Sequence, residues 1–478
     1  MPSSARPSST DTALPAGEPS GAKKMQPRHL VLMSLGSAIG TGLFVGSGEG
    51  IAAAGPAVLI SFLIAGTMVI LIMRMMGEMA AADPSSGAFS VYAEKALGRT
   101  AGTTVGWMWW FQIVIVIAAE ATAAAAIVAS LIPGVEQWML ALAFIIVFTA
   151  VNLAGAASLG EFEYWFAILK VAAIIIFLAV GAAFVAGLLP GVPSPGTSNL
   201  FDNGGFMPNG LTGVASGLLL VVFAFGGTEI ITIAAADTEE PSKNIAGAIN
   251  SVIWRILVFY IGSVLVMVTV LPWDSEALST GPFVAVLHAA KVPGADTVMA
   301  VVIVIALLSA MNANLYGASR MIYSLGERGR APAALGRLGS GGVPRRAVLA
   351  SVVFGFIAVV LNYLYPDTVL MILLNTVGST CLVVWGISIV SQIILRRRAE
   401  AAGVELTFKM WAFPWLSYFA LALLAGIVVL GFFDPDVRIQ LLATAALSTV
   451  LVLLAWSFER RSAAKARTAP ADRGNQAG

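Results

Sequence analysis

The sequence has little charge, one cysteine and two histidines, and each shortage excludes a class of protein. Only 11% of its 478 residues are Asp, Glu, Lys or Arg, whereas a soluble domain carries about 25%. The single cysteine, Cys381, cannot form an intrachain disulfide and lies in an apolar segment, so we interpret it as a packing residue. The histidines and the cysteine form no cluster with the spacing of a metal site, and we expect no metal and no cofactor.

Motifs for nucleotide-driven or covalent chemistry are also lacking. The sequence has no G-x-x-x-x-G-K-[ST] phosphate-binding loop, so we do not expect ATP to drive this chain directly. The run "GTGLFVG" is similar to a dinucleotide-binding fingerprint, but its spacing is wrong and no strand precedes it. We therefore predict that the chain is not an enzyme.

Long apolar runs are what the sequence has in abundance. Hydrophobic residues make up 58% of the chain, and a helix of about 20 apolar residues crosses a bilayer. The fold class predicted is therefore an all-α integral membrane protein. The segment 281–291 is too brief to span and is predicted to form a short outer helix. Twelve transmembrane helices are predicted near 29–53, 56–80, 103–131, 137–154, 162–188, 211–236, 247–271, 297–323, 347–364, 367–394, 412–432 and 438–458.

The basic residues indicate how these spans are oriented. Lys and Arg concentrate in cytoplasmic loops, and they fall on one side here if both termini are inside. We therefore expect a multi-pass protein of the cell inner (plasma) membrane. A disordered cytoplasmic tail is expected over 1–27, the transporter domain over 28–460 and a second cytoplasmic tail over 461–478. The basic residues on the inner side include Lys23, Lys24, Arg28, Lys95, Arg99, Lys243, Arg328, Arg345, Arg396 and Arg460.

Glycines interrupt two of the predicted spans near their middle. The stretch "LGSAIGTGLF" at 35–44 carries three glycines in span one, and "FAFGGTEI" at 223–230 carries an adjacent pair in span six. Close helix packing is one explanation. The other is a pair of broken helices, which in corresponding positions of inverted repeats indicate a transporter's binding site. Because spans one and six run in opposite directions, we predict repeats over 28–190 and 208–395, followed by two extra helices over 410–460.

A broken helix would expose backbone polar groups at mid-membrane, where it is tolerated only beside a cavity or within protein. Amides at the start of one half-helix favour an anion, and carbonyls at the end of the other favour a cation. One site could therefore hold both ends of a zwitterion, and an amino acid is the obvious cargo.

Polar residues inside the predicted spans are further candidates for function. Lys170 is explained either by snorkelling to the inner interface or as a resident cation that releases and recaptures a proton. Glu229 could cap unwound amides or take part in proton coupling. Glu120, expected nearer the outer side, could pair with a substrate amine or bond a neighbouring helix. In span eight, Asn312 and Asn314 of "LLSAMNANLYG" could bond between helices or contact the cavity.

Seven stretches together resemble the amino acid permeases of the amino acid–polyamine–organocation superfamily, specifically the bacterial amino acid transporter family. Within that family the sequence is most similar to the 4-aminobutyrate (GABA) permeases. The resemblance covers roughly residues 25–460. It is carried by "GSAIGTGLFVGSG", "AGPAVLISFLIAG", "MRMMGEMAA", "GAFSVYAEKALG", "GEFEYWFAILKV", "FAFGGTEIITIAAADTEEP" and "NSVIWRI".

The resemblance implies a LeuT-like fold and proton-coupled uptake. It implies a substrate carboxylate at the amides around Thr41 and Gly42. It implies an amine near the carbonyls of Phe223, Ala224 and Gly226, and Phe223 matches an aromatic gate position. Lys170 matches a lysine thought to replace sodium in some relatives, and Asn314 falls near a position that flanks the pocket. The predicted substrate-binding set is Ile39, Gly40, Thr41, Gly42, Phe223, Ala224, Gly226, Gly227, Glu120 and Asn314, and the predicted proton-coupling residues are Lys170 and Glu229.

The expected function is secondary active import of an amino acid, GABA or a relative, by proton symport with alternating access around a midplane site. Three alternatives remain: a permease for aromatic or branched α-amino acids, an amino acid exchanger, and a substrate-sensing receptor of the same fold. The expected partners are a small amino acid, a proton and the lipid bilayer. No nucleic acid and no obligate protein partner are expected.

Overall fold

The computed structural model describes residues 39–85, 87–154, 159–227, 232, 241–339, 342–366 and 368–468. Within these ranges the chain forms helices and connecting segments and no β-strand. The first part holds α2 (Thr41–Phe44), α3 (Gly46–Ala54), the 3₁₀ helix η1 (Gly55–Ala57), α4 (Val58–Ala82), α5 (Ala88–Leu97), α6 (Arg99–Leu131), α7 (Gln137–Ala154), α8 (Leu159–Val185) and α9 (Ser198–Phe201). The second part holds α10 (Gly210–Ala224), α12 (Pro241–Val270), α13 (Ala277–Thr280), α14 (Pro282–Ala289), α15 (Ala295–Glu327), α16 (Arg345–Leu364), α17 (Val369–Ala401), α18 (Trp415–Gly431) and α19 (Pro435–Thr468).

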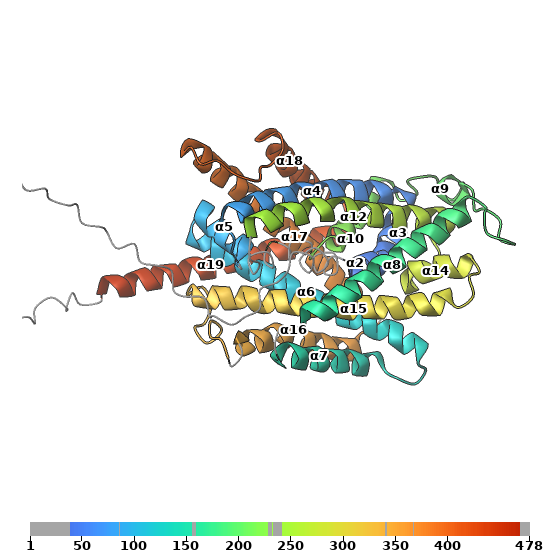
Figure 1. The fold of residues 1–478 in the computed structure, drawn as a ribbon, viewed down its shortest axis with the longest axis horizontal. Helices are drawn as coiled ribbons and strands as arrows, with labels where there is room; N and C mark the ends of the chain where they lie inside the picture. The colour runs from blue at the N-terminus through green and yellow to red at the C-terminus, as the bar shows by residue number, and fades with distance from the viewer. Residues whose placement is uncertain are drawn as a thin grey trace, which may run out of the picture.

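The long helices lie side by side along the long axis of the molecule (Figure 1). Helix α5 lies at one end of this bundle, and α9 and α14 lie at the other. Helix α19 extends beyond the bundle at the α5 end, and it reaches Thr468, so the helix continues into the predicted tail. Such an arrangement suits a bilayer, in which backbone polar groups must bond within their own helix.

Eight helical stretches in the described residues are long and apolar enough to cross a membrane. Helices α3 and α4 count as one of them, because η1 joins them directly. Helices α10 and α18 and the 257–270 part of α12 are apolar but shorter. The prediction of an all-helical membrane protein is confirmed, whereas the count of twelve spans and the inverted repeat stay predictions. The short helix predicted at 281–291 is present as α14.

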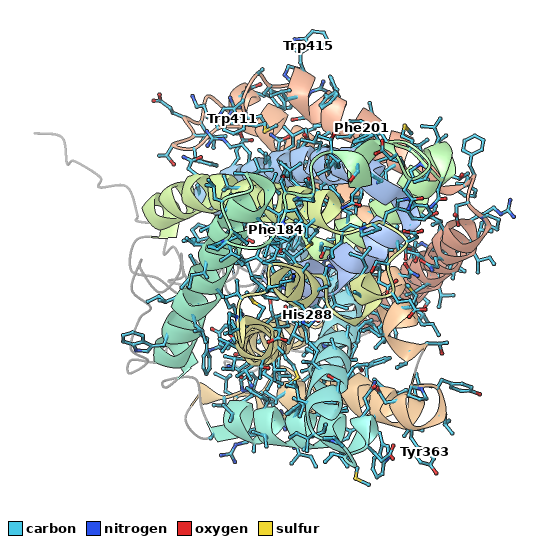
Figure 2. The ribbon with its side chains drawn as sticks, turned by 90° about the vertical axis from the view of Figure 1, so that its right-hand side faces the viewer. Phe184, Phe201, His288, Tyr363, Trp411 and Trp415 are labelled. Atoms are coloured by element: carbon cyan, nitrogen blue, oxygen red, sulfur yellow. The ribbon has the colours of Figure 1, made fainter. Side chains whose placement is uncertain are left out.

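Helices α6 and α15 form the centre of the bundle, and α7 and α19 lie at its outside. Side chains of α6 are buried along most of its length, whereas those of α19 are largely exposed. Figure 2 shows Tyr363 and Trp415 at opposite edges of the molecule, with their side chains directed outward. Exposed aromatic and aliphatic side chains on this rim suit contact with lipid.

Side-chain hydrogen bonds connect α6, α7, α15 and α16, which we call the four-helix frame. Each bond joins two of these helices through groups that are buried or partly buried, so the frame is held by polar contacts as well as by packing. Asn312 therefore forms an interhelical hydrogen bond, which is one of the two roles predicted for it. The bonds are Asn152 Nδ2 to Asn312 Oδ1 (2.9 Å), Asn362 Nδ2 to Thr122 Oγ1 (2.8 Å), Gln137 Nε2 to Asn362 Oδ1 (2.5 Å) and Trp110 Nε1 to Ser351 Oγ (2.9 Å).

A buried carboxylate fixes α4 to α17 and to the segment that follows α17. Glu78 of α4 is 2% exposed and accepts hydrogen bonds from Gln392 Nε2 at 2.8 Å, Arg396 Nη1 at 3.2 Å and the Met410 amide at 2.5 Å. Arg396 also pairs with Glu400 at 2.7 Å, and that side chain is 49% exposed. One guanidinium therefore joins a buried acid and an exposed acid.

Candidate functional site

The first predicted interruption lies where α2 begins. Ile39 and Gly40 form a bend, α2 starts at Thr41, and Val45 separates α2 from α3. A Cβ atom on Gly40 would lie 2.2 Å from Glu120 Oε1, so no larger residue fits without moving that carboxylate. The part of the predicted span before Ile39 lies outside the described residues.

The Glu120 carboxylate binds the start of α2. The Thr41 amide donates to Glu120 Oε1 at 3.1 Å and to Oε2 at 3.2 Å, and Thr41 Oγ1 donates to Oε2 at 2.8 Å. Thr41 is 0% exposed and Glu120 is 3% exposed. Glu120 thus bonds a neighbouring helix, which is one of the two roles predicted for it. The carboxylate occupies the donors at which a substrate carboxylate was expected.

The second predicted interruption lies at the end of α10. The helix ends at Ala224, and the Gly226 amide donates back to the Phe223 carbonyl at 2.8 Å. Gly227 has a backbone φ angle of +93°, which residues other than glycine rarely adopt. Residue Glu229 lies outside the described residues, so its two predicted roles stay predictions.

The two interruptions are in direct contact. A Cβ atom on Gly42 would lie 2.3 Å from the Ala224 Cα atom, which means that the two backbones touch. A Cβ atom on Gly46 would lie 3.7 Å from Phe223 Cδ1, an ordinary contact distance. Segments far apart in sequence therefore bring five of the predicted binding residues together: Gly40, Gly42, Glu120, Phe223 and Ala224.

Lys170 of α8 lies within electrostatic range of the Glu120 carboxylate. Its side chain is 0% exposed, so it is enclosed by protein and does not extend to a surface as a snorkelling lysine would. Its charge acts on Glu120, and Tyr260 of α12 also lies within electrostatic range of that carboxylate. The lysine and the phenol therefore both lie within electrostatic range of the carboxylate that binds the start of α2.

Asn314 of α15 is buried and incompletely bonded. It is 1% exposed, and its Oδ1 atom accepts no hydrogen bond from any residue in the described part of the chain. Ala310, one helical turn earlier, would contact a Cβ atom on Gly40 at 3.2 Å. Asn314 thus lies one turn from the first interruption, with an acceptor available.

Sequence reasoning missed Gln112 of α6, which reaches the second interruption. Gln112 is 0% exposed, and a Cβ atom on Gly226 would lie 4.0 Å from its Nε2 atom. A signal was present: Gln112 is a polar residue in an apolar span and precedes Glu120 by two helical turns on the same helix face.

Charged groups also lie at the two ends of the bundle, away from the two interruptions. Within the part of the chain that the structure describes, no group of three or more His, Cys, Asp or Glu side chains could hold a metal ion. His288 lies at the α14 end, where Figure 2 shows it, and its side chain is 80% exposed. At the α5 end Glu94 forms ion pairs with Arg328, at 2.9 Å, and with Arg330.

Comparisons with known proteins match almost the whole chain. A family model described as "Amino acid permease" matches residues 29–468. The aromatic amino acid transport protein AroP of Corynebacterium glutamicum is 48% identical over 436 residues, covering 90% of this chain and 94% of that protein. The gamma-aminobutyric acid permease of Bacillus subtilis is 44% identical over 440 residues, covering 92% and 94%. The protein of the same description in Escherichia coli is 41% identical over 438 residues, covering 90% and 94%.

Proposed function

The chain belongs to the amino acid permease family, and on that premise we propose that it imports GABA or a related amino acid together with a proton. Membership makes the chain an integral plasma-membrane transporter of amino acids, and not an enzyme. The observation that carries the rest of the proposal is the contact between the two interruptions at Gly42 and Ala224, beside the buried Glu120 carboxylate. Twelve spans, a LeuT-like inverted repeat and cytoplasmic termini are parts of the same proposal.

The substrate is proposed to lie between the two interruptions. Its carboxylate would take the donors at the start of α2, over Ile39–Gly42, and its ammonium would face the carbonyls at the end of α10, over Phe223–Gly227. Glu120 holds the Thr41 donors in this structure, and two carboxylates repel each other at such distances. The incoming carboxylate therefore displaces Glu120 from the Thr41 donors.

Proton coupling is assigned to Lys170 and Glu229. A fully enclosed lysine loses much of the solvation that stabilises its charge, so it can release and recapture a proton as its surroundings change. Its interaction with Glu120 connects that event to the substrate site. Transport then proceeds by movement of the helices around the site against the four-helix frame.

A second candidate substrate class has support of its own. AroP of Corynebacterium glutamicum, an aromatic amino acid transport protein by its description, is 48% identical to this chain. An aromatic or branched α-amino acid would use the same backbone groups and extend its side chain into the pocket. Exchange of one amino acid for another is a further mode of the same site.

Uptake into proteoliposomes tests the proposal. The purified protein is reconstituted, an inward proton gradient is imposed, and accumulation of labelled GABA is measured against a panel of unlabelled amino acids. The proposal expects saturable, gradient-dependent accumulation that collapses with a protonophore. Binding without accumulation would identify a receptor, and accumulation that needs an internal amino acid but no gradient would identify an exchanger.

A further inference from the structure

Gln112 has a hydrogen-bonding atom that the folded chain does not use. Its Nε2 atom donates to the Cys381 thiol of α17 at 3.3 Å. Its Oε1 atom accepts no hydrogen bond within the described residues, although the side chain is 0% exposed. Buried polar atoms are nearly always bonded, so an acceptor left open in an enclosed place needs an explanation. Binding of a donor from outside the protein is such an explanation.

The position of Gln112 relates this acceptor to the substrate site. Its amide lies against the turn at Gly226, where α10 has ended. Along α6, Gln112, Val116 and Glu120 follow at intervals of one helical turn, and Val116 packs in the same apolar cluster as Phe223. One face of α6 therefore runs from Thr41 at the first interruption, past Phe223, to Gly226 at the second.

The distance between the two polar positions of this face limits what can bridge them. Eight residues of helix separate the Gln112 and Glu120 Cα atoms by roughly 12 Å. With its carboxylate at Thr41, an α-amino acid keeps its ammonium close to the carboxylate and directs its side chain toward Gln112. An amino acid whose ammonium is several carbons away directs the ammonium itself toward Gln112.

We propose that Gln112 is a specificity-determining residue whose Oε1 atom accepts a hydrogen bond from the end of the substrate remote from its carboxylate. This inference rests on the substrate placement in the proposed function. The ligand class favoured is an amino acid that carries an N–H or O–H donor at its far end, as ω-amino acids do, over one that ends in a purely apolar group. The Cys381 thiol holds the amide so that Oε1 stays available. A site that bonds a substrate donor discriminates strongly against analogues that lack it, because the acceptor is then left buried and unbonded.

The test compares wild type and Gln112→Leu in proteoliposomes by competition with GABA, butyrate, tyrosine and phenylalanine. Butyrate lacks the ammonium of GABA, and phenylalanine lacks the hydroxyl of tyrosine. The inference expects Gln112→Leu to weaken GABA about ten- to a hundredfold, because its ammonium is a charged donor, and tyrosine about two- to tenfold, because its hydroxyl is neutral. Phenylalanine should change less than about threefold. Gln440→Leu is the matched control, because Gln440 also has an open Oε1 atom but belongs to the outer helix α19. The substrate selectivity of this variant should be that of wild type.

Several outcomes overturn the inference and leave the proposed function intact. Equal loss for all four competitors, or no change for any of them, would show that Gln112 does not read the far end of the substrate. Where Gln112→Leu does not reach the membrane as a folded protein, Gln112→Asn and Cys381→Ala replace it, and both are expected to lower selectivity in the same direction. A wild type that carries tyrosine and phenylalanine but not GABA would refute the proposed substrate, and the tyrosine–phenylalanine pair would still test Gln112.

Discussion

Gly42 and Ala224 bring two interrupted segments into backbone contact across 182 positions of sequence, so close that a Cβ atom added to Gly42 would lie 2.3 Å from the Ala224 Cα atom. Neither residue has a side chain that would keep the two chains apart. Because both segments are out of regular helix near this contact, their remaining amides and carbonyls are available to a ligand. The proposed substrate site lies at this contact.

The first prediction concerns the size of residue 42. Gly42→Ala places a methyl group on the α10 backbone, so we expect at least a tenfold loss of uptake and a loss of about 1–3 kcal/mol of stability from overpacking. Gly46→Ala is the control, because its new Cβ atom meets Phe223 at 3.7 Å without overlap. Initial uptake rates and thermal denaturation of both variants measure the difference. Equal rates for the two variants would contradict the backbone contact.

The second prediction concerns the hydroxyl of Thr41. Thr41→Val removes the 2.8 Å hydrogen bond to Glu120 and leaves the amide in place. A hydrogen bond to a charged group contributes about 1.5–3 kcal/mol, so we expect a lower denaturation temperature in the substrate-free protein. Thr41→Ser keeps the hydroxyl and should behave as wild type. The idea fails if valine and serine give the same denaturation temperature.

The third prediction concerns the enclosed lysine. Lys170→Ala removes a buried cation that lies within electrostatic range of Glu120. We expect proton-driven accumulation to be abolished while exchange of labelled for unlabelled substrate continues. Lys291→Ala, an exposed lysine near the α14 end, should leave both assays unchanged. Gradient-driven uptake at the wild-type level in Lys170→Ala would exclude the lysine from coupling.

The fourth prediction compares two acids that share one arginine. Glu78 is 3% exposed at its side chain and Glu400 is 49% exposed, and both pair with Arg396. Removing one partner of a buried pair costs about 3–5 kcal/mol, whereas an exposed pair contributes about 0–1 kcal/mol. We therefore expect Glu78→Gln to destabilise the protein strongly and Glu400→Gln to have almost no effect. Chemical denaturation of both variants in detergent micelles provides the comparison.

The helices could be predicted from the sequence because hydropathy alone identifies long apolar segments. Each predicted span contains a helix in the described residues. The glycines of spans one and six identified where these two spans leave regular helical geometry. The reason is local: chain length, apolar composition and glycine content act within one segment. Contacts between segments depend on how the helices pack, which no single segment records.

Glu120 and Gln112 show what the sequence alone could not place. Counting residues along a span gives the depth of a Cα atom, but a glutamate side chain reaches a neighbouring helix at a different depth. Gln112 was missed because one amide in an apolar span is as common in helix packing as in a binding site. Only its distance from Gly226 and its open acceptor separate the two cases.

The four-helix frame has a mechanical consequence. Its helices are fastened by amide and hydroxyl groups, which are costly to separate where water is absent. The interrupted segments, by contrast, meet each other at Gly42 and Ala224 through close backbone packing, and α2 is joined to α6 of the frame by the hydrogen bonds between Thr41 and Glu120. On the proposed mechanism, a substrate that displaces Glu120 from Thr41 would therefore also release α2 from the frame.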